Sequence, residues 1–180
     1  MPSLPEPSRP SPAATSPPGG WAVAQPWVAT GLRLLLGGVM LWSGLAKVGD
    51  LAASVRAVRA FELLPESLAQ LVGYALPVVE IVVGLLLVVG LLTRYAAAVV
   101  ALLMLAFIVG IVSAWARGLA IDCGCFGGGG AIEPDQTQYP LEIVRDLALF
   151  AAAAVLVRWP TSRFSLDSSL GLTVPVRAAA

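Results

Sequence analysis

The chain has 180 residues, of which 58% are hydrophobic and only 12% are charged, and its mean hydropathy is +0.85. A soluble domain carries charge on roughly a quarter of its residues, so this composition excludes an ordinary soluble protein and indicates an integral membrane protein. The 11 basic residues balance the 11 acidic ones, which leaves no basic surface for nucleic acid. Histidine is absent and there are two cysteines, too few ligands for a structural zinc site, so we expect no metal site.

The N-terminal segment, residues 1–26, begins with 20 residues that are mostly Pro, Ser, Ala and Gly. A segment with so little apolar surface is expected to stay disordered. It lacks the basic start, apolar run and cleavage site of a secretory signal, so we expect it to be retained as a cytoplasmic tail. Residues 161–180 form a second, polar tail at the other end of the sequence.

Four apolar stretches are each long enough to cross a bilayer as a helix, which takes about 20 residues. They cover about residues 27–48, 71–92, 95–116 and 141–159. The second and third are separated by a very short turn, which predicts an antiparallel helical hairpin. The expected fold is therefore all-α, with four transmembrane helices in one bundle that forms a single membrane domain over residues 27–160.

The connection between the first two spans, residues 50–70, has an amphipathic pattern. Leu51, Val55 and Val58 recur at helical spacing, with Arg56 and Arg59 on another face. This pattern predicts a short helix on the membrane surface, ended by Pro65. A plain surface linker and a role in gating a substrate both remain open for it.

Seven charged residues fall inside the predicted spans. Glu142 lies in the first turns of the fourth span and Arg158 at its end, and the other five are candidates for an intramembrane charge network. These five are Arg33, Lys47, Glu80, Arg145 and Asp146. Unpaired charges inside a membrane are costly, so such residues face protein or water. Counting helical rise from the ends of the spans predicts a deep layer in which Arg33 meets Glu80, and an upper layer of Lys47, Asp146 and Arg145 beneath the cysteines. The pairs could hold the bundle together without taking part in any chemistry.

The orientation in the membrane is set by the distribution of basic residues. If both termini are cytoplasmic, five basic residues lie on the cytoplasmic side (Arg9, Arg94, Arg158, Arg163 and Arg177). Four lie on the other side (Lys47, Arg56, Arg59 and Arg117). The positive-inside rule favours this orientation by one residue. It also places both cysteines in the oxidising, extracytoplasmic compartment, where disulfides persist.

The two cysteines, Cys123 and Cys125, are separated only by Gly124, in a glycine-rich loop between the third and fourth spans. A disulfide between them would close a small strained ring, and strained disulfides are the oxidising, labile kind. A cation such as Lys47 would favour the thiolate form, whereas Asp122 would oppose it. Cys125 is further from Asp122 and is the expected nucleophile.

Several motifs together resemble the MauE branch of the DoxX-like membrane proteins. They are Arg33 and Ser43-Gly44-x-x-Lys47, then Leu64-Pro65 and Leu76-Pro77-x-x-Glu80, then Cys123-Gly-Cys-Phe-Gly127 and Arg145. The resemblance covers about residues 27–160, and the Cys-Gly-Cys-Phe-Gly run is its most specific part. It implies a four-helix protein of the bacterial cytoplasmic membrane that works with an extracytoplasmic thioredoxin-fold partner. It also implies a link to methylamine utilisation, although nothing in this sequence points to methylamine itself.

The sequence therefore favours thiol–disulfide exchange by Cys123 and Cys125 with such a partner. One cysteine pair is enough to receive electrons but not to pass them to a second pair, so electrons would go either to a quinone or to another protein. No cofactor other than a possible quinone is indicated, and no oligomeric state. The alternatives are a structural disulfide or idle thiols in a membrane scaffold that assembles a redox partner, and a small transporter that uses Glu80 and Arg33.

Overall fold

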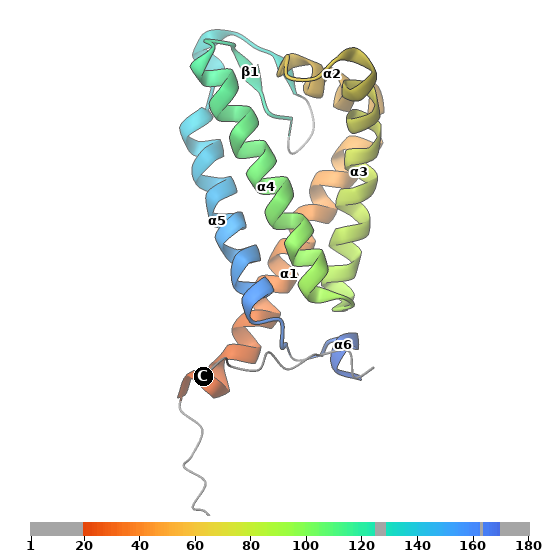
Figure 1. The fold of residues 1–180 in the computed structure, drawn as a ribbon, viewed down its shortest axis with the longest axis vertical. Helices are drawn as coiled ribbons and strands as arrows, with labels where there is room; N and C mark the ends of the chain where they lie inside the picture. The colour runs from red at the N-terminus through yellow and green to blue at the C-terminus, as the bar shows by residue number, and fades with distance from the viewer. Residues whose placement is uncertain (1–19, 125–128, 163, 170–180) are drawn as a thin grey trace, which may run out of the picture.

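A computed structural model describes residues 20–124, 129–162 and 164–169. Four long helices, α1 (Gly20–Val48), α3 (Glu66–Val89), α4 (Thr93–Ala116) and α5 (Tyr139–Arg158), lie side by side in an elongated bundle (Figure 1). The upper end carries α2 (Leu51–Ala60), the strands β1 (Ile121–Asp122) and β2 (Gly130–Ala131), and a 3-10 turn at Pro134–Gln136. The lower end carries the α3–α4 turn and the short helix α6 (Leu166–Ser169).

Three of the helices among the described residues are long and apolar enough to cross a membrane: Ala24–Val48, Glu66–Val89 and Thr93–Ala116. Large apolar side chains on their outer faces are exposed, including Trp42, Leu71 and Leu102. Exposed apolar surface on this scale fits lipid. The chain is therefore a multi-pass membrane protein.

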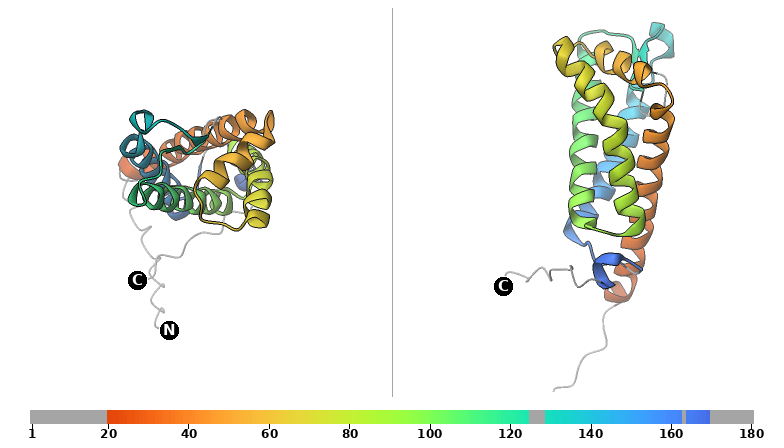
Figure 2. Two further views of the ribbon diagram at one scale, coloured as in Figure 1. Left: turned by 90° about the horizontal axis from the view of Figure 1, so that it is seen from above. Right: turned by 90° about the vertical axis from the view of Figure 1, so that its right-hand side faces the viewer.

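The fourth predicted span is a helix, α5, that runs alongside α4 over its length (Figures 1 and 2). It is not among the three helices with the composition of a membrane span. The reason is local, because Glu142, Arg145 and Asp146 all fall in its first two turns. Residues 147–157 of α5 are apolar, and Ala153 and Leu156 are fully buried against the bundle core.

The helix boundaries differ from the predicted spans mainly at their N-terminal ends. Helix α1 begins at Gly20 and includes Pro26, so residues 20–26 are helical and the expected tail of residues 1–26 is too long. Residues 1–19 lie outside the described residues. Helix α3 begins at Glu66 and ends at Val89, and its C-cap residue Gly90 adopts the left-handed conformation (φ 74°) and donates its N–H to the Leu86 carbonyl. Hydropathy locates the apolar part of each helix but not the first turns that precede it.

The predicted amphipathic helix of residues 50–70 is present but shorter than expected. Asp50 caps α2, because its carboxylate accepts a hydrogen bond from the Ala53 N–H at 2.8 Å. The helix ends at Ala60, before Glu62 with its left-handed backbone (φ 51°), and Pro65 precedes α3 as its N-cap. Pro65 therefore begins the next helix and does not end this one, as its missing N–H and fixed φ allow at a helix start.

Glycines set the register between α1 and α3. A Cβ atom added at Gly44 would lie 2.9 Å from the Pro77 carbonyl oxygen, and one at Gly37 would lie 3.1 Å from the Gly84 carbonyl oxygen. The two helix backbones therefore touch at two levels, as small residues permit in membrane bundles. This contact places Gly44 opposite the turn of α3 that carries Glu80.

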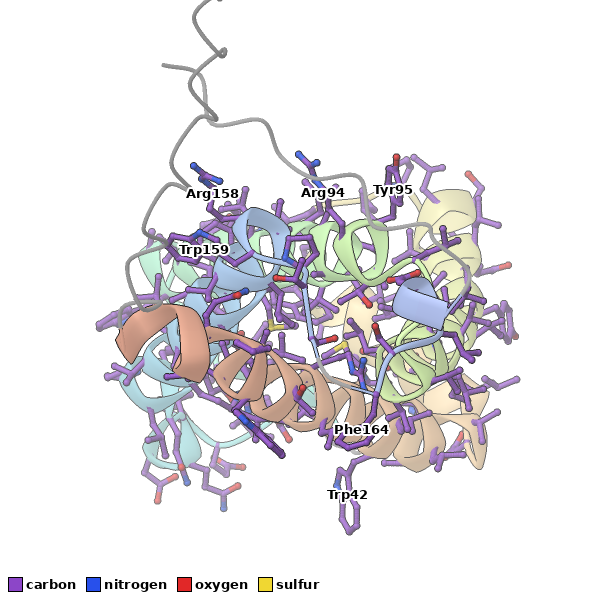
Figure 3. All side chains as sticks on the ribbon, turned by 90° about the horizontal axis from the view of Figure 1, so that it is seen from below. Trp42, Arg94, Tyr95, Arg158, Trp159 and Phe164 are labelled. Atoms are coloured by element: carbon purple, nitrogen blue, oxygen red, sulfur yellow. The ribbon has the colours of Figure 1, made fainter. Side chains whose placement is uncertain are left out.

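The described residues of the C-terminal segment lie at the lower end of the bundle. Helix α6 lies at this end of the bundle (Figure 3). Arg94 and Arg158 project outward from a different side of the bundle (Figure 3). The Asp167 carboxylate accepts hydrogen bonds from the Leu92 and Thr93 N–H groups at 2.7 and 2.9 Å. Helix α4 has no side-chain cap from its own N-cap residue, Leu92, so Asp167 caps it from 75 residues away.

Candidate functional site

Cys123 directly follows β1 in a short antiparallel hairpin. Ile121 pairs with Ala131 and Asp122 with Gly130. The buried Tyr139 at the start of α5 holds this hairpin to the bundle, because its hydroxyl accepts from the Ile121 N–H at 2.9 Å and donates to the Leu119 carbonyl at 2.5 Å. Tyr139 was not singled out by sequence reasoning, since a lone aromatic residue at a helix start carries no distinguishing pattern.

The backbone turns sharply after Cys123. Gly124 has a left-handed φ of 65°, and its N–H donates to the Asp122 carboxylate at 3.1 Å. This conformation favours glycine, which explains why the residue between the cysteines is Gly. Cys125 and Phe126–Gly128 lie outside the described residues, so the geometry of the cysteine pair itself is not described.

Arg145 on α5 is the positively charged residue that contacts Cys123. Its Nη2 donates to Cys123 Sγ at 3.6 Å, and its Nε donates to Asp146 Oδ1 at 2.9 Å. Asp146 is 1% exposed, so a buried carboxylate anchors the guanidinium that faces the sulfur. A positive group beside a sulfur favours the thiolate. The sequence had placed Lys47 in this role, and the structure places Arg145 there.

Two carboxylates also lie near the sulfur. One ligand atom each from Asp122, Cys123 and Glu142 lie within 4.8 Å of one another, an arrangement that could hold a metal ion. The Arg145 guanidinium at the same sulfur places a positive charge where a metal cation would bind. Glu142 had been noted only as a charge in the first turns of the fourth span.

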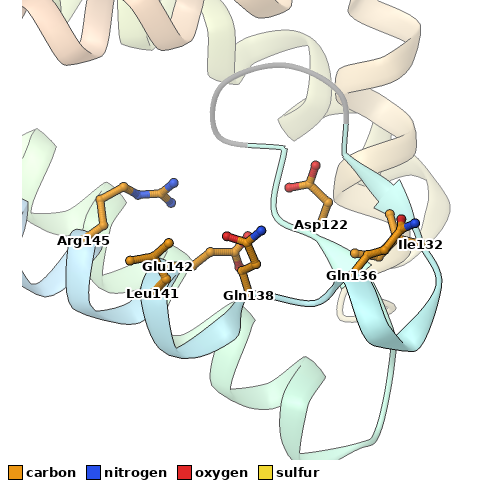
Figure 4. Close-up of a pocket in the computed structure, with 7 residues that line it drawn as sticks. All are labelled: Asp122, Ile132, Gln136, Gln138, Leu141, Glu142 and Arg145. Atoms are coloured by element: carbon orange, nitrogen blue, oxygen red, sulfur yellow. The ribbon is translucent and has the colours of Figure 1, made fainter.

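These groups line a cleft of about 510 Å³ at the upper end of the bundle (Figure 4). Asp122 faces it from the hairpin, and Glu142 and Arg145 face it from α5 (Figure 4). Gln136 and Gln138 add amide groups from the preceding loop. The cleft is open and polar, so water and a second protein both have access to the groups around Cys123.

Lys47 and Glu80 form a buried ion pair in the upper part of the bundle. Lys47 Nζ lies 2.6 and 2.9 Å from the two Glu80 carboxylate oxygens and 2.9 Å from Ser43 Oγ. The lysine is 6% exposed and the glutamate 0%. The predicted pairing of Glu80 with Arg33 is therefore wrong. Of the predicted upper layer, Arg145 and Asp146 are hydrogen-bonded to each other, and Ser43, which accepts from Lys47, lines one small cavity with both of them.

The direction of helical side chains explains this difference. Every Cα–Cβ bond tilts toward the N-terminus of its helix. On α1 the Lys47 side chain therefore descends into the bundle, while Glu80 on the antiparallel α3 rises to meet it. Arg33 descends away from Glu80 and donates to Ser162 Oγ at 2.9 Å and to the Phe164 carbonyl at 3.1 Å. The depth estimate ignored the direction of the side chains.

The structure thus places the five residues of the predicted charge network in three hydrogen-bonded groups. Arg145 and Asp146 adjoin Cys123, Lys47 and Glu80 pair beneath them, and Arg33 binds the C-terminal segment at the lower end. Only the first of these groups touches a cysteine among the described residues. It is the candidate functional site.

Comparison with known proteins identifies the family of this chain. The family model described as "Methylamine utilisation protein MauE" matches residues 25–158. The methylamine utilization protein MauE of Paracoccus denitrificans is 35% identical over 133 residues, which cover 73% of this chain and 69% of that protein. No solved structure matches the chain. The match spans α1 to α5, including the hairpin and the residues around Cys123, and the chain belongs to the MauE family of membrane proteins.

Proposed function

We propose that this protein is a membrane thiol–disulfide redox protein that exchanges disulfides through Cys123 and Cys125 with an extracytoplasmic thioredoxin-fold partner. The observation that carries the proposal is the contact between Arg145 Nη2 and Cys123 Sγ at 3.6 Å. A structural thiol is buried among apolar groups and needs no cation. Here the guanidinium is anchored by a buried carboxylate and faces an open polar cleft.

The exchange starts from the Cys123–Cys125 disulfide. A partner thiolate attacks the Cys125 sulfur, the sulfur–sulfur bond breaks, and Cys123 leaves as a thiolate that Arg145 stabilises. The partner's second thiolate then attacks the partner sulfur of the mixed disulfide, which releases an oxidised partner and a reduced Cys123–Cys125 pair. A stabilised leaving thiolate speeds thiol–disulfide exchange. Two electrons pass from the partner to this chain, and its thiols take up the two protons.

The test is to trap the mixed disulfide. In Cys123→Ser, the Cys125 thiolate can still attack the disulfide of an oxidised partner, which releases one partner thiolate and forms a mixed disulfide. Cys123 is no longer present to attack the Cys125 sulfur and displace the partner, so an adduct with a thioredoxin-fold protein should accumulate on non-reducing gels after acid quenching. Cys125→Ser should give little adduct. If neither single variant forms an adduct and the double variant still supports full oxidation of the partner in cells, the protein acts as a scaffold for that partner and the redox proposal is wrong.

We infer further that α5 completes a bundle of four membrane helices, as in DoxX-like proteins, in the bacterial cytoplasmic membrane. The sequence count of five basic residues on the side of the termini against four on the other side supports cytoplasmic termini and an extracytoplasmic hairpin. Single cysteines placed at Ser16 and Ser168, in a chain without its native cysteines, should resist a membrane-impermeant maleimide in intact cells. Labelling of both positions would reverse the orientation.

The relative's name links it to methylamine utilisation. The contact between Arg145 and the Cys123 sulfur is of the kind that thiol chemistry uses. If this chain has the same role, it serves that process through disulfides in another protein and not by acting on methylamine.

A further inference from the structure

An apolar groove of about 250 Å³ lies between α3, α4 and the α2–α3 connection. Its walls include Phe61, Leu64, Val72, Ala106 and Phe107, and almost none of its lining is polar. Leu64 and Val72 are exposed, so the groove is open at the outer surface of the bundle. Since α3 and α4 both have the composition of membrane spans, that surface faces lipid.

The groove adjoins both the apolar cluster around Cys123 and the buried Lys47–Glu80 ion pair. Phe61, on its wall, packs against the same buried cluster as Cys123, which consists of Ile111, Ala114, Ile121 and Tyr139. Phe107, on its floor, has its ring centroid 5.9 Å from Lys47 Nζ. A molecule in the groove would therefore be separated from the cysteine cluster by the Phe61 ring, and from the Lys47–Glu80 pair by the Phe107 ring.

A hydrogen-bond donor, Arg117, contacts the backbone of Phe61, one of the wall residues of the groove. Arg117 donates from Nη2 to the Phe61 carbonyl and from Nε to the Ser113 carbonyl. Its side chain is exposed, and its guanidinium has further N–H groups to offer. The groove thus combines an apolar interior with a cation bonded to the backbone of one of its walls, which fits a ligand with an apolar ring and tail and a polar carbonyl oxygen.

We propose that this groove binds a lipid-soluble quinone that reoxidises the cysteine pair, an inference that rests on the function proposed above. Each turnover leaves Cys123 and Cys125 as two thiols, and oxidising them to a disulfide releases two electrons and two protons. A quinone takes up both electrons and two protons to become a quinol. The chain has no second cysteine pair and no histidine for a haem, so the electron acceptor must come from outside it.

The experiment uses the full chain in lipid nanodiscs with ubiquinone-1 as the probe. Two reactions are followed by thiol alkylation: reoxidation of the reduced cysteines by the quinone, and disulfide exchange with a thioredoxin-fold protein. Ala106→Trp fills the groove, and Leu105→Trp is the matched control on the same helix, because Leu105 is exposed and does not line the groove. Ala106→Trp should slow reoxidation by quinone at least tenfold and leave exchange intact, while Leu105→Trp should change neither.

A photoreactive azidoquinone gives a second readout on the unmodified protein. It should label peptides within residues 58–76 or 103–110, and ubiquinone-1 should compete with it. Equal reoxidation rates in Ala106→Trp and Leu105→Trp, or labelling elsewhere, would overturn the groove as the quinone site. If the wild type exchanges with the protein partner but quinone never reoxidises it, or if only phospholipid acyl chains occupy the groove, the quinone inference fails and the proposed exchange stands. Failure of the exchange itself counts against the proposed function.

Discussion

The Lys47–Glu80 pair and the Arg145–Asp146 pair are both held inside the bundle, but their hydrogen-bonding groups are used differently. Both carboxylate oxygens of Glu80 contact Lys47 Nζ, which also donates to Ser43. In the other pair, Asp146 Oδ1 accepts from Arg145, while the buried Oδ2 has no hydrogen-bond partner among the described residues. Both carboxylate oxygens of Glu80 are thus hydrogen-bonded, which makes this a closed pair, whereas Asp146 keeps one oxygen that can accept a further hydrogen bond.

The difference separates a structural ion pair from a reactive one. A closed, fully buried pair stabilises a single arrangement of α1 against α3 and offers nothing to a reaction. Arg145 instead bridges a buried carboxylate and the Cys123 sulfur, and its side chain is 29% exposed at the cleft. Negative charge that develops at that sulfur during exchange can therefore be balanced by Arg145.

The largest expected effect is the loss of protein stability when the Lys47–Glu80 pair is broken. Glu80→Gln leaves a buried ammonium without its carboxylate, and breaking a buried pair in this way typically costs about 3–5 kcal/mol. The free energy of unfolding, measured by SDS titration in mixed micelles, should fall by that amount. Adding Lys47→Met should recover part of the loss, because the unpaired charge is then gone.

A double-mutant cycle with Arg33 is the control for this prediction. Arg33 binds Ser162 and Phe164 and not Glu80, so the effects of Arg33→Gln and Glu80→Gln should add. Strong coupling between Arg33 and Glu80, together with additive effects of Lys47 and Glu80, would contradict the pairing seen in the structure.

The second effect concerns reactivity at Cys123. Arg145→Gln removes the cation from a sulfur that has Asp122 and Glu142 nearby, so the thiolate form becomes less favourable. In a Cys125→Ser background, alkylation of Cys123 by N-ethylmaleimide at neutral pH should slow about tenfold, which corresponds to about 1.4 kcal/mol. Arg145→Lys should retain part of the rate.

Arg56→Gln is the matched control, because it removes an exposed cation at the same end of the bundle without touching Cys123. Its alkylation rate should equal that of the parent. Equal rates in Arg145→Gln and Arg56→Gln would mean that the guanidinium does not act on the sulfur, and would remove the main support for the redox proposal.

The sequence predicted what hydropathy and short motifs can show. Three long helices, the α2 helix and the presence of charges inside the spans follow from composition and helical spacing. It did not predict which charges meet, because that depends on the register between α1 and α3 and on the tilt of each side chain. Gly37 and Gly44 allow the close contact that fixes this register, but the sequence does not show which helix backbone packs against a given glycine.

The site around Cys123 was predicted only in part for a similar reason. The Cys-Gly-Cys run and the charges of Arg145 and Asp146 were recognised, but the contact between Arg145 and the sulfur depends on a hairpin of two-residue strands. Strands this short have no periodicity to detect. Nor does Tyr139, whose hydroxyl ties the hairpin to α5, form a pattern with any neighbour in the sequence.

The smallest effect is expected at the lower end, far from both pairs, where Asp167 caps α4. Asp167→Ala removes the acceptor of the Leu92 and Thr93 N–H groups, and loss of a helix cap costs about 0.5–2 kcal/mol. The free energy of unfolding should fall by about 1 kcal/mol, while alkylation of Cys123 stays at the parental rate. Asp135→Ala, which changes an exposed carboxylate in the loop before α5, should affect neither. If Asp167→Ala also slowed alkylation of Cys123, the lower end would be coupled to the cysteine site, and the separation of structural and reactive charges along the bundle would not hold.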